Sequence, residues 1–214
     1  MTPAVVFVDY DGTITDADTF DVFVRHFAGD DGWNEIERRL AAGDITLREA
    51  LALEASLVTA ASLDEADDVL QRTVRFDPTF ARFVERCEAR GMRLTIVSSG
   101  IEPLIRRALE REGLSRVPLL ANPVTVSADG WRMDFRDASD NGNDKAALVR
   151  AARSSGASTI YIGDGYSDFD AALTADRRFA KRGRMLERFL RERSVTFQAF
   201  SNFAEVIAAL DAAA

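Results

Sequence analysis

The chain has 214 residues, of which 47% are hydrophobic and 29% charged, a balance that excludes a disordered protein. A formal net charge of −8 argues against a nucleic-acid partner, and no run approaches the ~18 apolar residues that a membrane-spanning helix needs. The sequence begins without the pattern of a secretory signal, and the single Cys87 cannot form an internal disulfide, so we expect a cytoplasmic protein.

The first predicted element is a strand at residues 5–8. This β-branched apolar run (VVFV) is followed directly by the polar segment DYDGT, as is typical of a buried parallel strand. Residues 15–76 differ, because aromatic residues recur there at helical spacing and no strand-like run appears. We therefore predict an all-helical insertion at 15–76, within an α/β core made of 1–14 and 77–214.

Two further apolar runs repeat the pattern of the first. Residues 93–97 end in SSG and precede a predicted helix at 103–112, and residues 159–162 end in GDG and precede one at 169–175. Strands that alternate with helices predict a doubly wound, mostly parallel sheet with a Rossmann-like arrangement. Ligands bind at the carboxyl ends of the strands in such sheets.

Three smaller elements complete the prediction. They are a hairpin at 124–135 with Asp-Gly at its turn, an edge strand at 195–197 and a closing helix at 202–210. We expect Trp131 to pack the hairpin on the α/β core.

Four aspartates follow the predicted strands, with Asp9 and Asp11 after the first and Asp164 and Asp168 after the third. If these strands are neighbours, the carboxylates meet at one edge of the sheet. Like charges this close would take up protons unless a cation neutralised them, and a hard divalent ion such as Mg²⁺ prefers oxygen ligands. A single aspartate could also be a helix cap or turn former, but four at strand ends favour a metal site.

An anion site is predicted beside the aspartates. Ser98-Ser99-Gly100 precedes a predicted helix, where hydroxyl and backbone N–H groups can bind an anion, although these residues also occur in ordinary loops. Lys145 falls in the first turn of another predicted helix, the end at which the helix dipole disfavours a cation. A nearby anionic ligand would explain this position, and a solvated surface lysine is the alternative.

In order and spacing, these residues resemble the four motifs of the haloacid dehalogenase-like superfamily of phosphohydrolases. The motifs are DYDGT at 9–13, VSSG at 97–100, Lys145 and GDGYSD at 163–168. The resemblance spans nearly the whole chain. It implies a doubly wound core with a cap inserted after the first strand.

The same resemblance implies a role for each residue. Asp9 would be the nucleophile that forms an aspartyl-phosphate, and Asp11 the general acid and base. Mg²⁺ would be held by Asp9, the Asp11 carbonyl and Asp164, while Asp168 would support metal-bound waters or orient Lys145. Ser98 and Lys145 would complete the catalytic set. The residues implied to bind the phosphoryl group are Gly12, Thr13, Ser98, Ser99, Gly100 and Lys145.

The helical cap resembles that of the phosphoserine phosphatase branch, in which an acid binds the substrate amino group and an arginine its carboxylate. Asp18 occupies the position of the acid, whereas Glu54 aligns with the arginine. A carboxylate there disfavours phosphoserine, unless Arg48 or Arg38 substitutes.

The end of the chain resembles the methionine-salvage phosphatases that act on 2-hydroxy-3-keto-5-methylthiopentenyl 1-phosphate. The shared features are DFDAA at 168–172, the Phe179-Ala180 pair and an aromatic start of the cap, whereas a cysteine-rich insertion found in some members is missing. The residues expected to line the substrate pocket are Asp18, Phe20, Trp33 and Glu54.

We therefore predict a Mg²⁺-dependent hydrolase of a small-molecule phosphate ester that acts through an aspartyl-phosphate, with a methionine-salvage enol phosphate as the candidate substrate. The alternatives are a phosphoserine phosphatase, a phosphotransferase that passes the aspartyl-phosphate to an alcohol, and a catalytically silent protein that binds a phosphorylated metabolite.

Overall fold

A six-stranded parallel sheet lies at the centre of the computed structural model, which describes residues 4–59 and 61–212. Its strand order is β3-β2-β1-β6-β7-β8, and every pair of neighbours is parallel. The predicted doubly wound α/β fold is confirmed. The strands are β1 (Val5–Val8), β2 (Arg93–Ile101), β3 (Leu119–Asn122), β6 (Thr159–Gly163), β7 (Arg177–Lys181) and β8 (Gln198–Phe200).

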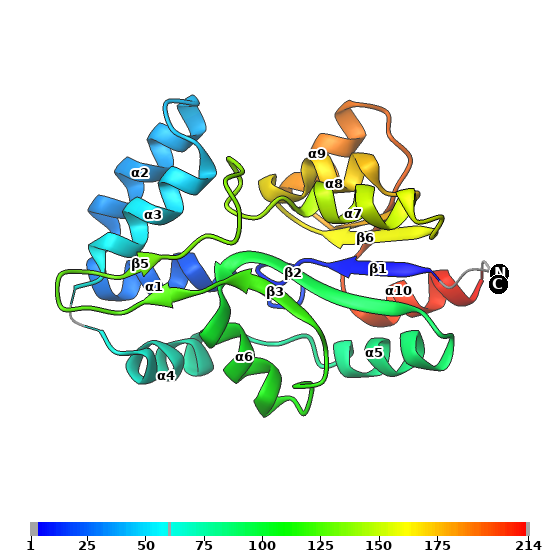
Figure 1. The fold of residues 1–214 in the computed structure, drawn as a ribbon, viewed down its shortest axis with the longest axis horizontal. Helices are drawn as coiled ribbons and strands as arrows, with labels where there is room; N and C mark the ends of the chain where they lie inside the picture. The colour runs from blue at the N-terminus through cyan, green and yellow to red at the C-terminus, as the bar shows by residue number, and fades with distance from the viewer. Residues whose placement is uncertain (1–3, 60, 213–214) are drawn as a thin grey trace.

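Helices cover both faces of this sheet (Figure 1). All four residues of β1 are buried, because Val6 and Val8 pack into one layer and Val5 and Phe7 into the other. This two-sided burial explains why the strand is a continuous apolar run. One layer contains α5 (Phe80–Ala89), α6 (Glu102–Arg111) and α10 (Phe203–Asp211), and the other contains α7 (Lys145–Ser154), α8 (Phe169–Thr174) and α9 (Met185–Glu192).

Four helices lie between β1 and α5. They are α1 (Thr19–Ala28), α2 (Asp30–Ala42), α3 (Leu47–Leu57) and α4 (Leu63–Thr73). Thr46 and Ser62 form capping boxes that fix where α3 and α4 begin. Thr15 and Phe76 pair in an isolated antiparallel bridge, which brings the two ends of this segment together. In Figure 1, α2 and α3 stand beyond the carboxyl end of the sheet, whereas α4 lies beside α6.

The predicted hairpin is present, as β4 (Val124–Thr125) and β5 (Arg132–Met133), but it packs on a different partner. Trp131 is buried among the helices that follow β1 and not in the sheet core. Its ring centroid lies 4.5 Å from that of Phe23, and its Nε1 donates to the Ala61 carbonyl at 2.9 Å. The expected packing on the α/β core was wrong, because these helices supply both the apolar contacts and the hydrogen-bond acceptor.

The boundaries of two predicted strands also differ. β2 continues through Ser98-Ser99-Gly100 to Ile101, with a register shift against β3 after Val97, so this segment is strand and not loop. β8 begins at Gln198, because Val195 and Phe197 pack against the layer of α7, α8 and α9 instead of pairing with β7.

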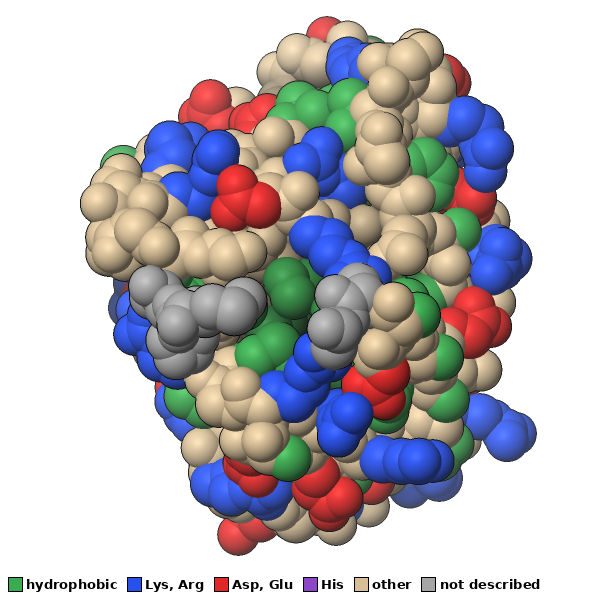
Figure 2. Space-filling model, turned by 90° about the vertical axis from the view of Figure 1, so that its right-hand side faces the viewer, with side chains coloured by type: hydrophobic (Ala, Val, Ile, Leu, Met, Phe, Trp, Pro, Cys, Tyr) green, Lys and Arg blue, Asp and Glu red, His purple; other side chains and the backbone are tan. Residues whose placement is uncertain are grey.

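Figure 2 shows the side of the molecule at which β1 begins in Figure 1. Hydrophobic side chains lie in a hollow there, with Lys and Arg side chains around it. A cavity of about 550 Å³ near the start of β1 has Val5, Leu94 and Arg116 in its lining, and none of the predicted site residues. The predicted site residues Asp9 and Asp164 lie at the opposite end of the sheet, because they follow the last residues of β1 and β6. Within the two described ranges, no helix has the length and hydrophobicity of a membrane-spanning segment.

Candidate active site

The strand order brings the carboxyl ends of β2, β1 and β6 side by side. Asp9 follows β1, and its N–H donates to the Ile162 carbonyl of β6 at 2.9 Å. One carboxylate oxygen from each of Asp9, Asp164 and Asp168 lies within 4.8 Å of the others. Asp11 contacts the end of β2 through Ser98. The structure thus brings the four predicted carboxylates to one edge of the sheet.

Lys145 lies inside this cluster and not on the surface. Its side chain is 1% exposed, and its Nζ donates to Asp9 Oδ1 at 2.5 Å, to Asp168 Oδ1 at 2.7 Å and to Ser167 Oγ at 2.8 Å. Burial lowers the pKa of Lys145, but the charges of Asp168 and Asp9 outweigh it and raise the pKa above its usual range. The side chain therefore remains an ammonium ion despite its burial.

Asp168 fixes the position of Lys145. Its Oδ1 accepts hydrogen bonds from Lys145 and from the Tyr161 hydroxyl at 2.6 Å, and its Oδ2 accepts the N–H groups of Asp164 and Gly165, each at 2.9 Å. Both oxygens are thus engaged by the protein, which favours the orienting role of Asp168 over metal support. Sequence reasoning missed Tyr161, which lies within an apolar strand and gives no separate signal there.

Asp11 is held by residues from two distant segments. Its Oδ1 accepts the Thr19 N–H at 3.0 Å and the Thr19 hydroxyl, and its Oδ2 accepts the Ser98 hydroxyl at 3.1 Å. Burial raises the pKa of Asp11, while these hydrogen bonds lower it without cancelling the rise. Thr19 was also missed, because the first residue of a helix has no sequence signature that points to a site.

Two of the predicted glycines are required by close approach to carboxylates. Gly12 has φ +70°, and a Cβ there would collide with the carboxylate of Asp164. A Cβ on Gly100 would lie 2.7 Å from Asp11 Oδ2. These glycines let the chain pass close to the aspartates.

The predicted phosphate-binding groups differ in how far they are engaged within the protein. The N–H of Gly12 donates to Thr15 Oγ at 3.1 Å, and Thr13 is fully buried with its hydroxyl 3.4 Å from Asp164. Ser98 Oγ accepts the Gly100 N–H at 2.8 Å. Gly12 and Thr13 therefore shape the turn around Asp164, whereas Ser99 and Gly100 line the cavity described below.

The carboxylates of Asp9, Asp164 and Asp168 carry more negative charge than Lys145 can neutralise. Burial and the charge of Asp168 raise the pKa of Asp9 well above its usual range, and the same two causes raise the pKa of Asp164 to about 7. Lys145 supplies one positive charge against these three carboxylates. Clustered oxygen donors with excess negative charge fit a divalent cation, so the residues present suit the metal that the sequence predicts.

A cavity of about 400 Å³ opens over the aspartates. Its floor includes Asp9, Asp11 and Asp164, and its opposite wall comes from α1, α2 and α3. This wall mixes carboxylates with apolar side chains: Asp18, Phe20, Asp21, Glu37, Leu40, Leu47, Leu51 and Glu54.

Glu54 is an unusual member of this wall. It is 2% exposed, and its Oε1 has no hydrogen-bond partner among the described residues. Burial and the nearby charges of Asp21 and Glu37 raise the pKa of Glu54 to about 8, so the carboxyl is largely protonated at neutral pH.

Three residues considered from the sequence lie outside this cavity. Trp33 does not line it but donates from Nε1 to Asp21 Oδ1 at 3.1 Å, so it orients a wall residue. Arg38 pairs with Glu35 on the surface of its own helix. Arg48 donates hydrogen bonds to the carbonyl groups of Asp137 and Asp140, which precede α7. Neither arginine therefore supplies the carboxylate contact that a phosphoserine phosphatase would need.

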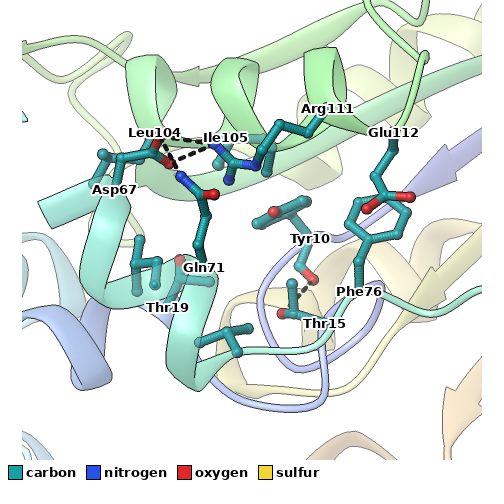
Figure 3. A pocket seen from close by; sticks show the side chains of 13 residues that line it. Tyr10, Thr15, Thr19, Asp67, Gln71, Phe76, Leu104, Ile105, Arg111 and Glu112 are labelled. Carbon is teal, nitrogen blue, oxygen red and sulfur yellow. Dashed lines mark hydrogen bonds and ion pairs between the residues drawn. The ribbon is translucent and has the colours of Figure 1, made fainter. Parts of the chain in front are cut away.

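A second cavity, of about 210 Å³, has Tyr10 in its lining, the residue between Asp9 and Asp11 in the sequence (Figure 3). Tyr10 and Thr19 lie on one side of it, and Asp67 and Arg111 form an ion pair at 2.7 Å on the other. The side chain of Tyr10 thus faces away from the site that its two neighbours form.

Comparison with known proteins agrees with this geometry. The family model for haloacid dehalogenase-like hydrolases matches residues 6–173. The chain is 35% identical to Pdp3-interacting factor 1 of Schizosaccharomyces pombe, covering 94% of this chain and 92% of that protein. It is 28% identical to polyol phosphate phosphatase PYP1 of Saccharomyces cerevisiae, covering 98% and 93%.

Two further matches complete the comparison. The chain is 30% identical to the 2-hydroxy-3-keto-5-methylthiopentenyl-1-phosphate phosphatase of Geobacillus kaustophilus, covering 96% of this chain and 94% of that protein. A phosphoserine phosphatase solved as a phospho-aspartyl intermediate analogue has a TM-score of 0.75 at 16% identity, covering 98% of this chain and 99% of that one, which shows a shared fold. The chain belongs to the haloacid dehalogenase-like hydrolase family, as the sequence motifs predicted, and is a phosphatase of that family.

Proposed function

We propose that this phosphatase hydrolyses small phosphomonoesters through a phosphorylated Asp9. The observation that carries the proposal is the pair of carboxylates on the floor of one cavity. Asp9 is held by the buried Lys145, and Asp11 is held by Thr19 and Ser98.

The two carboxylates divide the chemistry between them. Lys145 binds Oδ1 of Asp9, so Oδ2 is the oxygen that attacks phosphorus. As the bond from phosphorus to the ester oxygen breaks, Asp11 gives its proton to that oxygen and an alcohol departs. Asp11 then takes a proton from the water that attacks phosphorus, which releases inorganic phosphate and restores the Asp9 carboxylate. The raised pKa of Asp11 supports the protonated form that the first step needs.

We propose Mg²⁺ as the cation of this site, held by the Asp9 carboxylate, the Asp11 carbonyl and Asp164. When bound, it supplies positive charge to the phosphoryl oxygens. Lys145 adds an ammonium group beside Asp9, and Asp168 holds that ammonium in place. We assign phosphoryl binding to Lys145, Ser98, Ser99 and Gly100.

We take residues 15–76 as the cap that determines specificity. The Thr15–Phe76 bridge supports these boundaries, because it closes the segment where it leaves and rejoins the sheet. Three helices of this segment supply the wall opposite the aspartates. The division is not sharp at α4, which packs on α6 of the core.

The acidic wall favours a phosphate ester whose alcohol part is uncharged and rich in hydroxyl groups, such as a polyol phosphate. Carboxyl oxygens accept hydrogen bonds from hydroxyl groups. Glu54 Oε1 has no hydrogen-bond partner among the described residues, and the carboxyl is largely protonated, so this group can also donate a hydrogen bond. A substrate carboxylate would instead face Asp21 and Glu37, which disfavours phosphoserine. The similarity to a relative named polyol phosphate phosphatase supports the same choice.

A methionine-salvage enol phosphate is the second candidate. Leu40, Leu47 and Leu51 form an apolar part of the same wall, which would accept a methylthio group. The similarity to phosphatases of that name supports this reading.

Initial rates of phosphate release with Mg²⁺ test these proposals. The panel comprises glycerol 3-phosphate, erythritol 4-phosphate, phosphoserine and 2-hydroxy-3-keto-5-methylthiopentenyl 1-phosphate. We expect kcat/KM for a polyol phosphate to exceed that for phosphoserine by about 10-fold or more, equivalent to about 1.4 kcal/mol. A preference for phosphoserine would contradict the polyol assignment. Transfer of phosphate to added alcohols in place of water would favour a phosphotransferase. Inactivity on a broad panel of phosphate esters would favour a catalytically silent binding protein.

A further inference from the structure

Arg48 contacts the segment that leads to Lys145. It lies in the first turn of α3, the helix that also carries Leu51 and Glu54 of the cavity wall. Its guanidinium donates to the Asp137 carbonyl and lies 4.3 Å from the ring centroid of Phe135. Its backbone N–H donates to the Asp140 carbonyl at 2.7 Å. Arg48 of α3 therefore makes three contacts with the segment at 135–140.

Asp137 connects Arg48 to the start of α7 through hydrogen bonds. Its Oδ2 accepts the Asp144 N–H at 2.8 Å, and its Oδ1 accepts the Ser139 N–H at 2.9 Å. Asp144 is the N-cap of α7 and accepts the Ala147 N–H at 2.8 Å. Lys145, the first residue of α7, follows directly.

The far end of the same segment is fixed to β2 and β3. Asn143 Nδ2 donates to the Ser98 carbonyl at 2.9 Å and to the Leu120 carbonyl at 3.1 Å, and Ser99 Oγ donates to the Asn141 carbonyl at 2.9 Å. The segment at 135–144 is thus held by Arg48 of α3 on one side and by β2 and β3 on the other.

The Lys145 ammonium stays beside Asp9 through its contacts with Asp9, Asp168 and Ser167, and these contacts depend on where α7 begins. The N-terminus of α7 carries the positive end of the helix dipole, which disfavours an ammonium group in the first turn. A displacement of a catalytic group by about 1 Å can cost on the order of 10²-fold in rate. Contacts that fix the start of α7 therefore matter for the reaction and not for folding alone.

We propose that Arg48 is a positioning residue, which holds residues 135–144 so that the Lys145 ammonium stays beside Asp9. The proposal rests on the proposed function, in which Lys145 binds the phosphoryl oxygens. It also links α3, whose Leu51 and Glu54 line the cavity, to Lys145, which we assign to phosphoryl binding.

The test compares Arg48→Ala and Arg48→Lys with Arg38→Ala, an exposed arginine of the neighbouring cap helix that pairs with Glu35. The substrate is p-nitrophenyl phosphate, and inorganic phosphate is the inhibitor. All assays are run at a temperature at which circular dichroism shows each variant to be folded. We expect Arg48→Ala to lower kcat by about 10-fold or more and to weaken phosphate inhibition several-fold. Arg48→Lys should recover part of both, and Arg38→Ala should match the wild type.

A double-mutant cycle separates positioning from packing. If Arg48 acts through Lys145, Arg48→Ala should have little further effect on phosphate inhibition in a Lys145→Met background. Equal effects of Arg48→Ala in both backgrounds, or a change in KM with kcat and phosphate inhibition unaltered, would overturn the proposal. If Lys145→Met does not fold, calorimetric titration of inorganic phosphate into wild type and Arg48→Ala decides, and equal affinities reject it. A wild type that neither turns over esters nor binds phosphate would reject the proposed function itself.

Discussion

At the scale of single residues, Asp9 combines burial with a salt bridge to Lys145. It is 4% exposed, and its carboxylate faces the cavity that Asp11 shares. Asp9→Asn removes the nucleophile but keeps the shape of the side chain, so we expect phosphatase activity to fall on the order of 10³-fold or more. Phosphate release under saturating substrate measures the effect. Asp31→Asn, the same substitution at an exposed position of α2, should retain full activity, and an active Asp9→Asn would exclude the aspartyl-phosphate.

The raised pKa of Glu54 predicts that the free energy of unfolding depends on pH, independently of catalysis. Its pKa is about 8 in the folded protein against 4.5 as the ordinary value, so the folded state retains a proton that the unfolded state loses. The free energy of unfolding should therefore decrease as the pH rises from about 5 to 8, by up to about 1.4 kcal/mol per pH unit from this group.

Glu54→Gln, which cannot ionise, should lose this component of the pH dependence. Urea unfolding at pH 5.5, 7 and 8 measures it, and the variant should gain stability relative to the wild type toward alkaline pH. The exposed Glu35→Gln is the control. Parallel curves for wild type and Glu54→Gln would show that Glu54 titrates normally.

At the scale of helices and strands, the hairpin β4–β5 determines how α1 and α3 are held. Trp131 is 1% exposed and packs on Phe23, so Trp131→Ala leaves a large cavity and an unpaired Ala61 carbonyl. We expect a loss of about 3–5 kcal/mol in the free energy of unfolding, and a smaller loss for Trp131→Phe. Denaturant unfolding measures both, and a loss below about 1 kcal/mol for Trp131→Ala would contradict this packing.

The sequence predicted most elements of the fold because their local patterns are strong. The apolar runs of β1, β2 and β6 and the turn residues after them identify parallel strands and the edge where the site forms. β7 was missed because Arg177 and Arg178 interrupt its apolar pattern, although the Arg177 guanidinium lies 5.0 Å from the ring centroid of Phe179 and its stem is partly buried. Local pattern identifies elements, but it does not state which layer an element packs on, as Trp131 shows.

The candidate site was more predictable at the sheet than in the cap. Asp9, Asp11 and Asp164 follow strands of the parallel sheet, so their convergence follows from strand order. Lys145 was found from another signal, a cation in the first turn of a helix. The cavity wall depends on how α1, α2 and α3 turn against one another, which a single sequence does not give. Trp33 was therefore expected in the pocket, and Glu37 was not.

At the scale of the whole molecule, one end of the sheet gathers negative charge in a chain that already carries −8. Asp9, Asp164 and Asp168 lie within 4.8 Å of one another beside a single buried lysine, so their mutual repulsion opposes folding. A cation that binds the folded state alone stabilises it by about 2.7 kcal/mol at a concentration of 100 times its Kd. For a chain of this length, we therefore expect Mg²⁺ at 100 times its Kd to raise the Tm of chelator-treated protein by about 5–10 °C.

Thermal unfolding during a Mg²⁺ titration measures this effect, with NaCl at matched ionic strength to remove general screening. Asp164→Asn is the informative variant, because it replaces a carboxylate ligand by a weaker, neutral amide ligand and removes one of the repelling charges. Without Mg²⁺ this variant should unfold at a temperature equal to or above that of the wild type, because burial and Asp168 hold the pKa of Asp164 near 7 and make its charge costly. With Mg²⁺ the order should reverse, because the variant has lost a carboxylate ligand. Equal shifts with Mg²⁺ and NaCl, or an undiminished Mg²⁺ shift in Asp164→Asn, would place the cation elsewhere.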